Sequence, residues 1–332
     1  MTSTHRRGPA AGHGPRVVAL GGGHGLAATL RAMRRVTDNL TAVVGVSDDG
    51  GSSGRLRRDF GVPPPGDLRM ALAALCGDDT WGRTWSRVVQ HRFGGAGDLK
   101  GHSLGNLLIM SLWEETGDVV AGLDWVASLL GAQGRVLPVA VQPLEIVATV
   151  TGFGQDPTAT VEIHGQVAVA TTKGRVTSIR TQPANPPACP EAIEAIKEAD
   201  VILMGPGSWY TSVIAPLLVP ELLEAVRTSS AKRIVVLNLV AQSGETSGFT
   251  SERYISVLVD QFSHFPVDVV IADTRSTTNR DAVAALCKSA LGAELLLRPV
   301  ASTTGEAGIH DPDLLAAAFA EVTGRGRIST WR

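Results

Sequence analysis

The stretch from Ser47 to Arg58, SDDGGSSGRLRR, combines groups that suit a phosphorylated ligand. Two adjacent carboxylates, Asp48 and Asp49, are costly to bury together, so this is not a packing sequence. Backbone N–H groups, hydroxyls and a guanidinium all donate to phosphate oxygens. The expected donors are Gly50, Gly51, Ser52, Ser53 and Arg55. We therefore expect a phosphate site, with Asp48 and Asp49 available to a ribose hydroxyl or to Mg²⁺.

A second glycine cluster, GGGHG at 21–25, lies between an apolar run and a stretch with helical spacing. The amides at a helix start favour an anion, although a tight turn without a ligand is the alternative. Counted from Gly23, the cluster also fits a dinucleotide fingerprint loosely, with Ala28 as the third small residue and Asp48 about 20 residues further on. The candidate binding residues here are Gly22, Gly23 and Gly25.

Three further segments offer polar groups to the same ligand. GPGS at 205–208 is followed by a helical stretch that Ser208 is placed to cap, and the two glycines suggest ligand contact as well. Asn238 and the loop after it offer amide and hydroxyl groups, although a plain turn is equally natural. Asp67 in PPPGDLR either caps the next helix or also reaches the ligand. The candidates are Gly205, Gly207, Ser208, Asn238 and Asp67.

Two catalytic motifs fail on context. GHSLG at 101–105 matches GxSxG, and Asp273 and His310 follow in hydrolase order, but GGAGDLKG before it cannot form the buried strand that a nucleophile elbow needs. We expect His102 and Asn106 to present polar groups to the ligand from a helix start, with a packing role for the histidine as the alternative. No GxxxxGK[ST] string occurs, which excludes a P-loop.

These loops need a scaffold, and the sequence predicts a doubly wound, mainly parallel, Rossmann-like α/β sheet. Short apolar runs alternate with amphipathic stretches, as in a sheet covered by helices on both faces. The predicted strands are Arg16–Leu20, Thr41–Val46, Val201–Met204, Ile234–Asn238, Val267–Ala272 and Leu295–Pro299. The predicted helices are Leu26–Val36, Asp67–Leu75, Ser103–Glu115, Val119–Leu130, Glu191–Glu198, Ser251–Gln261, Asp281–Leu291 and Asp313–Val322.

The special loops follow these strands directly, so they should meet at the carboxyl edge of the sheet as one composite site. The loops are Gly21–Gly25, Asp48–Arg55, Gly205–Ser208, Asn238–Thr246 and Asp273–Arg280. The region at about 134–180 departs from the alternation: Val, Ile and Thr are frequent and Gly and Pro punctuate short runs, which predicts inserted β-hairpins.

We expect a single domain over 16–322, a disordered leader over 1–15 and a mobile tail over 323–332. In the tail, Thr323 or Thr330 could accept phosphate from a regulatory kinase.

The chain has 332 residues, 44% hydrophobic and 19% charged, with a net charge of −2, which is typical of a soluble protein and gives no reason to expect nucleic acid. Three distant cysteines indicate no zinc site and a reducing compartment, and no apolar run approaches the ~18 residues of a membrane span. We expect a cytoplasmic protein, with a homodimer left open.

Six motifs resemble one known family in order and spacing: GGGHGL, SDDGGSSGRLR, PPGDLR, GHSLGNLLI, GPGSWYTS and NLVAQSGET. The family is that of the gluconeogenesis factors, also called YvcK-like or CofD-like, which is related to the 2-phospho-L-lactate transferases. The resemblance extends from about Val17 to Val322. This chain has His24 where the family usually has threonine, and Met70 where it usually has asparagine, which puts the selectivity of the first loop in question.

The resemblance implies a Rossmann-like fold, a cytoplasmic location and binding of UDP-sugars such as UDP-N-acetylglucosamine (UDP-GlcNAc). It implies a regulatory, non-catalytic role in cell shape and cell-wall homeostasis during growth on gluconeogenic carbon sources. The enzyme alternative is a Mg²⁺-dependent phosphotransferase in which Asp48, Asp49 or Asp67 ligates the metal. A second alternative, suggested by the fingerprint, is an NAD-binding oxidoreductase.

Overall fold

Strand β1 (Val17–Gly21) is wholly buried and lies in the interior of a seven-stranded sheet. It pairs in parallel with β2 (Leu40–Val44) on one side and with β7 (Val201–Met204) on the other. A strand that is covered on both faces needs apolar side chains on both, which is why VVALG reads as a continuous apolar run. The computed structural model describes residues 14–153, 156, 158–303 and 308–324.

The sheet extends from this centre in both directions. Its order is β10-β9-β8-β7-β1-β2-β3, and all these pairings are parallel. The outer strands are β3 (Arg135–Pro138), β8 (Lys232–Val236), β9 (Val269–Asp273) and β10 (Glu294–Arg298). The chain therefore winds outward one way through β2 and β3 and the other way through β8 to β10, which confirms the doubly wound α/β fold.

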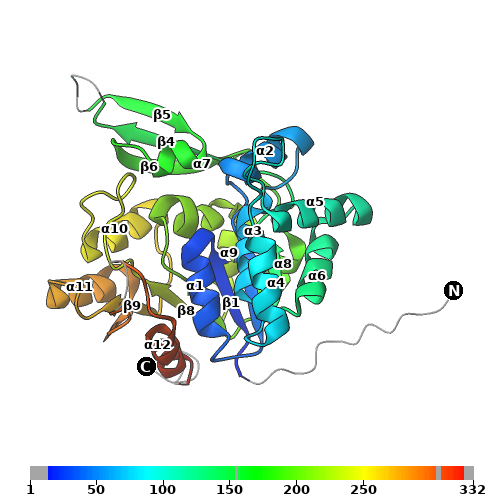
Figure 1. Cartoon of the computed structure of the whole chain (residues 1–332). Helices are drawn as coiled ribbons and strands as arrows, with labels where there is room; N and C mark the ends of the chain where they lie inside the picture. The colour runs from blue at the N-terminus through cyan, green and yellow to red at the C-terminus, as the bar shows by residue number, and fades with distance from the viewer. Residues whose placement is uncertain (1–13, 154–155, 157, 304–307, 325–332) are drawn as a thin grey trace.

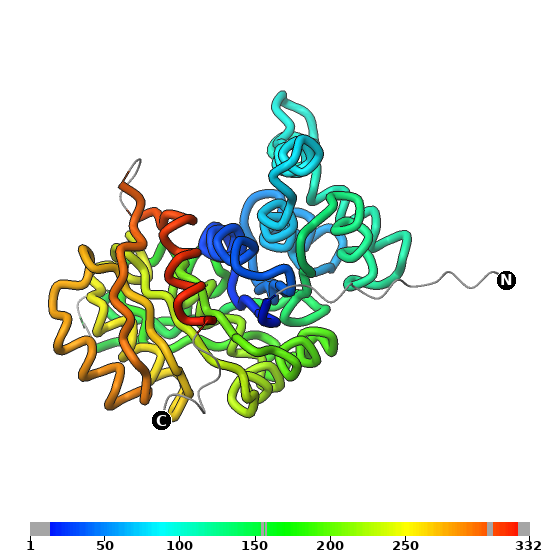
Figure 2. Tube along the Cα trace, turned by 90° about the horizontal axis from the view of Figure 1, so that it is seen from below, coloured from blue at the N-terminus to red at the C-terminus, as the bar shows by residue number. Residues whose placement is uncertain are grey.

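Helices cover both faces of this sheet (Figure 1). In front lie α1 (Gly23–Met33), α3 (Pro65–Ala74), α4 (Thr80–Gln90) and α12 (Pro312–Gly324). Behind lie α8 (Pro190–Glu198) and α9 (Pro220–Thr228). Figure 2 shows α12 in red beside α1 in blue, so the first and last helices of the described chain pack together. The remaining helices are α5 (Leu104–Thr116), α6 (Val119–Leu130), α10 (Ser251–Gln261) and α11 (Arg280–Leu286).

A small antiparallel sheet stands at the top of Figure 1, beyond the carboxyl edge of the large sheet. Its central strand, β4 (Glu145–Thr151), pairs with β5 (Thr160–His164) and with β6 (Arg175–Gln182). The short helix α7 (Gln166–Ala170) lies between β5 and β6. The expected hairpins are present, but the expectation was wrong for β3, which pairs in parallel with β2 and belongs to the large sheet.

Besides α7, three α-helices of the described chain were not predicted. Helix α2 (Gly51–Phe60) occupies the stretch that we interpreted as an open phosphate loop, and α4 and α9 were overlooked although Asp79 caps the first and Pro220 begins the second. Glycine and serine are poor helix formers, so GSSGRLRRDF does not predict a helix. Tertiary contacts stabilise α2: Leu56 is buried, and Arg57 donates to the Leu144 carbonyl at 2.8 Å.

Both ends of the described chain are attached to the domain. The Gly14 carbonyl accepts from Asn39 and the Pro15 carbonyl from Thr37, so the expected leader is already ordered at these two residues. Helix α12 continues through Thr323 to Gly324, and the Thr323 hydroxyl donates to the Phe319 carbonyl. The remainder of the expected leader and tail, 1–13 and 325–332, lies outside the described residues.

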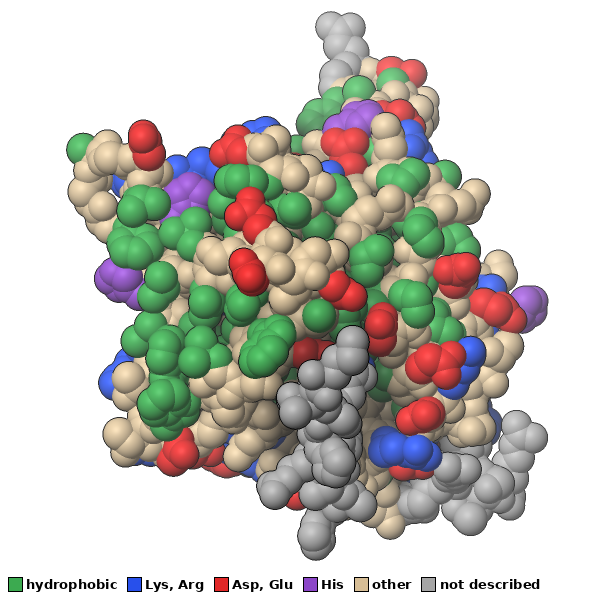
Figure 3. All heavy atoms as spheres, turned by 90° about the vertical axis from the view of Figure 1, so that its right-hand side faces the viewer, with side chains coloured by type: hydrophobic (Ala, Val, Ile, Leu, Met, Phe, Trp, Pro, Cys, Tyr) green, Lys and Arg blue, Asp and Glu red, His purple; other side chains and the backbone are tan. Residues whose placement is uncertain are grey.

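Apolar side chains gather on the side of the molecule that Figure 3 shows, which carries α4, α5 and α6 in Figure 1. Trp81 of α4 is 55% exposed and Trp125 of α6 is 63% exposed. No single helix of the described ranges is long and apolar enough to cross a membrane. A bent pair, 209–218 with α9, passes by length and composition, but Trp209, Ile214 and Leu217 are buried in the core.

Candidate functional site

Four helices begin close together at the carboxyl edge of the large sheet. A β-carbon on Gly66, at the start of α3, would lie 2.2 Å from Ser53 Oγ in the first turn of α2. Asn106, in the first turn of α5, donates to Ser52 Oγ at 3.0 Å. Asp67 of α3 accepts from the backbone N–H of Gly23, where α1 begins. First-turn amides have no acceptor inside their own helix, so this convergence favours a bound anion.

Ser52 connects α2 to α5 through two buried contacts. Its hydroxyl oxygen lies 3.0 Å from Asn106 Nδ2 and 3.0 Å from His102 Nδ1. Burial and the nearby Arg55 guanidinium both lower the pKa of His102, which favours its neutral form. Beside them, Asn106 Oδ1 and Ser103 Oγ are buried and have no partner among the described residues. A ligand that offers hydrogen-bond donors and acceptors would satisfy these atoms.

Arg69 is the residue that most clearly indicates an anion site. The residue is 4% exposed, and its Nε and Nη1 have no hydrogen-bond partner within the described chain. Burial, followed by repulsion from Arg92, lowers the pKa of Arg69 to about 10. Asp67 and Asp48 act in the opposite direction but form no hydrogen bond to these two atoms. A buried, unpaired guanidinium is costly, and a bound phosphate would offset that cost.

Two carboxylates, those of Asp48 and Asp67, interact electrostatically in the same region. Burial and the charge of Asp48 raise the pKa of Asp67 to about 7, although the Gly23 N–H opposes the shift. Asp48 accepts from the Gly50 N–H at 2.9 Å, and its Oδ2 approaches Gly66. Asp67 does not cap α3 as one reading expected: the capping position is Pro64, and no side chain caps that helix. Repulsion between two close carboxylates is what a divalent cation would relieve.

Asp49 has a different role from its neighbour. Its Oδ1 accepts from the Val167 N–H of α7 at 2.9 Å, and its Oδ2 approaches Gly165. The side chain therefore fastens the small sheet to the loop after β2. Within the described ranges, no group of three or more His, Cys, Asp or Glu side chains could hold a metal by itself. The expectation that Asp48, Asp49 or Asp67 ligates Mg²⁺ stays a prediction.

The loops after β7 and β8 hold each other in place. Asn238 Nδ2 donates to the Gly207 carbonyl at 2.7 Å, and Asn238 Oδ1 accepts from the Gly207 N–H at 2.9 Å. Both ends of this amide are thus engaged by the GPG turn. Ser208 precedes the helical turn at Trp209–Ile214, but it does not cap that turn as predicted: its hydroxyl donates to Gln242 Oε1 at 3.2 Å.

Gly25 joins the two groups of loops. A β-carbon at Gly25 would lie 1.8 Å from the Pro206 carbonyl oxygen, so only glycine allows the start of α1 to approach the GPG turn. A β-carbon at Gly205 would likewise collide with Thr29 Oγ1, at 2.2 Å. The glycines that resemble a dinucleotide fingerprint are therefore explained in part by packing within the protein.

Two cavities lie beside the polar residues described above. One of about 690 Å³ lies between α2 and α5 and is lined by Arg55, Lys100 and His102. The other, of about 180 Å³, is lined by His24, Asn238 and His310. His24, which departs from the family pattern, is exposed in the first turn of α1 and lines the smaller cavity. The first volume falls in the range of ligand pockets, ~300–1,000 Å³.

Asp273 and His310, the other members of the hydrolase pattern, serve the fold. Asp273 accepts four backbone N–H groups, from Arg275, Ser276, Val300 and Ala301. Burial lowers the pKa of His310 to about 4. The loop after β9 is therefore held together by its own carboxylate and offers no catalytic acid.

Three buried polar residues were not predicted from the sequence as site residues: Arg69, Ser103 and Glu245. Arg69 ends the PPPGDLR motif and Ser103 is the central serine of GHSLG, so each motif contained the signal beside the residue that we selected. Glu245 is 4% exposed and accepts from the Tyr210 N–H at 3.0 Å. Its burial raises the pKa to about 7.

A parallel sheet whose order reverses between β1 and β7, with helix starts gathered at its carboxyl edge, defines an α/β protein of the Rossmann-like class. The chain belongs to the family described as 2-phospho-L-lactate transferase CofD, which matches residues 17–290. Within it, the chain is 50% identical over 311 residues to the putative gluconeogenesis factor of Mycobacterium tuberculosis, covering 93% of this chain and 90% of that protein.

Two further relatives agree. The gluconeogenesis factor of Halalkalibacterium halodurans is 36% identical over 255 residues, which are 77% of this chain and 76% of that protein. A crystal structure of a Bacillus halodurans protein superposes with a TM-score of 0.81 at 30% identity, over 93% of this chain and 99% of that one. A second crystal structure of that protein, described as a member of the UPF0052 family, gives a TM-score of 0.80. The sequence resemblance to the gluconeogenesis factors is thereby confirmed.

Proposed function

We propose that the protein binds a nucleotide sugar, UDP-GlcNAc or a close analogue, and acts as a regulator without catalysing a reaction. Its role would be that of a gluconeogenesis factor, in cell shape and cell-wall homeostasis on gluconeogenic carbon sources. The name of the relatives supports the general role. The observation that carries the ligand class is Arg69, a buried guanidinium with two unpartnered nitrogen atoms beside four helix starts.

Each part of a nucleotide sugar has a candidate partner. The diphosphate would lie between Arg69, Ser53 and the first-turn amides of α2. The 690 Å³ cavity beside His102 would take the sugar or the nucleoside. Hydroxyl groups on either would pair with Asn106 Oδ1 and Ser103 Oγ, the buried atoms that have no partner within the described chain.

The test is a thermal-shift panel with UDP-GlcNAc, GTP and NAD on three proteins: wild type, Arg69→Gln and Arg58→Gln. Arg58 is an exposed arginine of α2 and serves as the matched control. A ligand that binds only the folded state raises the Tm by mass action, so UDP-GlcNAc should raise the Tm of wild type and Arg58→Gln but much less that of Arg69→Gln. Stabilisation by NAD with no effect of any UDP-sugar would refute the proposal.

The second candidate is a Mg²⁺-dependent phosphotransferase. The family description and the facing carboxylates of Asp48 and Asp67 favour it over other enzyme classes. A bound Mg²⁺ would neutralise charge on the phosphate, while Asp48 and Asp67 would hold the ion and Arg69 would orient the phosphoryl oxygens. Metal-dependent release of a nucleotide, lost in Asp48→Asn, would replace the regulator with this enzyme.

The remaining expectations stay predictions. An NAD-binding oxidoreductase has less support, because Gly25 is required by the contact with Pro206 whether or not a dinucleotide binds. Cytoplasmic location, a homodimer and phosphorylation of the tail at Thr330 each need a direct experiment. For the tail, the measurement is intact mass of protein from its native host, since one phosphate adds about 80 Da and two negative charges at most.

A further inference from the structure

Five arginines surround a groove on the helical layer, away from the carboxyl edge of the sheet. Arg31 lies in the last turn of α1, Arg34 and Arg35 follow the end of that helix, and Arg83 and Arg87 lie on α4; we call this set the arginine groove. The cavity between them measures about 350 Å³. Asp78 is its one acidic lining residue, so cations outnumber acids five to one along its wall.

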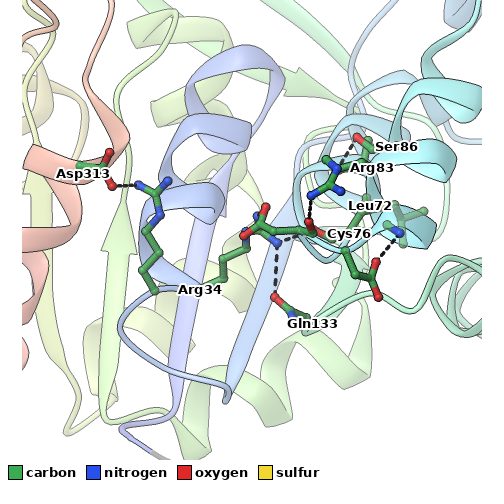
Figure 4. A network of polar contacts seen from close by, with 12 residues as sticks. Arg34, Leu72, Cys76, Arg83, Ser86, Gln133 and Asp313 are labelled. Atoms are coloured by element: carbon green, nitrogen blue, oxygen red, sulfur yellow. Dashed lines mark hydrogen bonds and ion pairs between the residues drawn. The ribbon is translucent and has the colours of Figure 1, made fainter.

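Three of the arginines are fixed by protein contacts. Arg34 donates to the Cys76 carbonyl, to Asp78 and, at 3.3 Å, to Gln133 Oε1, and Figure 4 shows it reaching from α1 to the turn after α3. Arg83 donates to the Asp78 carbonyl, and Arg35 forms an ion pair with Asp313 at 2.5 Å. These three arginines therefore have a structural role, because cations near the end of α3 can satisfy the carbonyl groups there.

Such contacts do not explain the remaining positive charge of the arginine groove. Arg31 and Arg87 form no hydrogen bond and no ion pair with any described residue. The Arg34 side chain is only 10% exposed, yet its Nε is buried without a partner in the described ranges. Burial and the charge of Arg34 both lower the pKa of Arg31.

We infer that the arginine groove is a second ligand site, which binds a small phosphorylated molecule carrying at least two negative charges. Guanidinium groups bind phosphate oxygens through paired N–H donors, and Arg31 and Arg87 carry such donors without a partner among the described residues. The cavity has the size of a small-ligand pocket and a floor of small residues, Ala73 and Ala74. Asp78 and Asp313 pair with Arg34 and Arg35, so a ligand with at least two negative charges matches the other three arginines of the groove.

The groove is distinct from the candidate site but shares two helices with it. Helix α3 begins beside Asp67 and ends at the groove, and α1 begins at Gly23 and reaches the groove at Arg31. A ten-residue helix is roughly 15 Å long, so the two ligands would not touch. The groove would then report a second metabolite to the same protein.

The test is titration calorimetry with inorganic pyrophosphate at moderate ionic strength. The groove variant is Arg31→Gln with Arg87→Gln, which removes two exposed charges that hold nothing else in place. Its matched control is Arg175→Gln with Arg275→Gln, two exposed arginines on β6 and after β9, which changes the net charge equally. Arg69→Gln separates the two sites, because it removes an anion partner only from the candidate site.

We expect the groove variant to weaken pyrophosphate binding at least about tenfold, while the control pair changes it less than twofold. Binding at the groove should persist in Arg69→Gln. The inference is overturned if the groove variant binds pyrophosphate like wild type, if binding disappears in Arg69→Gln alone, or if the control pair weakens it equally. Binding of heparin without binding of pyrophosphate would likewise overturn it, since it would indicate a surface for polymers.

Discussion

Asp67 Oδ2 lies so close to the backbone of Gly22 that a β-carbon at Gly22 would be 2.6 Å away from it. The residue between β1 and α1 and the first turn of α3 thus lie close together, with no room for a side chain between them. Gly22 has an extended backbone, with φ −161, so the restriction comes from this contact and not from backbone strain.

Gly22→Ala should destabilise the protein by about 1–3 kcal/mol, because the added methyl group displaces a buried carboxyl group. The measurement is chemical denaturation monitored by circular dichroism. Gly94→Ala is the control, since a β-carbon there meets nothing within 4 Å and should change stability little. Equal stability of Gly22→Ala and wild type would show that Asp67 moves freely.

Asp67→Asn should remove part of the pH dependence of stability. A carboxyl group whose pKa is about 7 in the folded state and near 4 when unfolded binds its proton more tightly in the folded protein. Its contribution therefore declines as the pH rises from about 4 to 7, by at most about 1.4 kcal/mol per pH unit, and is constant above that. The free energy of unfolding of Asp67→Asn minus that of the wild type should thus increase across this pH window, because only the wild type loses stability there.

Two other groups titrate nearby, so the comparison must be made between variants. Glu245, also with a pKa near 7, adds a slope of the same sign. His310, whose pKa falls to about 4 in the folded protein, adds a slope of the opposite sign between about pH 4 and 6.5, because its unfolded form binds the proton more tightly. A difference between Asp67→Asn and wild type that stays flat from pH 4 to 7 would contradict the assigned role of Asp67.

Mg²⁺ should distinguish the two adjacent aspartates. If a cation joins the ligand, Asp48→Asn should abolish the effect of Mg²⁺ on nucleotide-sugar or GTP affinity, whereas Asp49→Asn should retain it. The reason is that Asp49 already accepts the Val167 N–H, a contact that asparagine can preserve. Calorimetry with and without Mg²⁺ measures this; loss of the effect in Asp49→Asn alone would reverse the assignment.

Asn238→Ala should cost about 1–3 kcal/mol, because it leaves the N–H and the carbonyl of Gly207 without their partner. The ligand-free protein should show this loss by thermal denaturation. Asn279→Ala is the matched control, since Asn279 is exposed and its side chain caps nothing. A stable Asn238→Ala that loses only ligand affinity would instead favour direct contact between Asn238 and the ligand.

The fold was more predictable than the site. Buried strands such as VVALG and VILM are recognisable because covering both faces demands continuous apolar runs. Strand β3 was misassigned because RVLP is short and stands next to the Val- and Thr-rich insertion. Helix α2 was missed because its glycines are required by contacts, such as that of Gly54 with the Asp49 carbonyl, and not by a loop.

At the site, glycine and serine clusters identified the right edge of the sheet, because their composition is unusual in any context. The partners of each side chain were not predictable. Asp48 and Asp49 are neighbours in sequence with the same chemistry, yet one faces Asp67 and the other holds α7. Arg69 resembles any helical arginine until the fold shows that it is buried without a partner.

The position of β1 also constrains how the protein is made. Val17 pairs with Val201, so β1 waits for a partner that is synthesised far later. Such distant pairing gives a high contact order and slow folding. A nascent chain that ends before β7 exposes one edge of a wholly apolar strand, and during that interval it depends on chaperones or on the helices already formed to avoid aggregation.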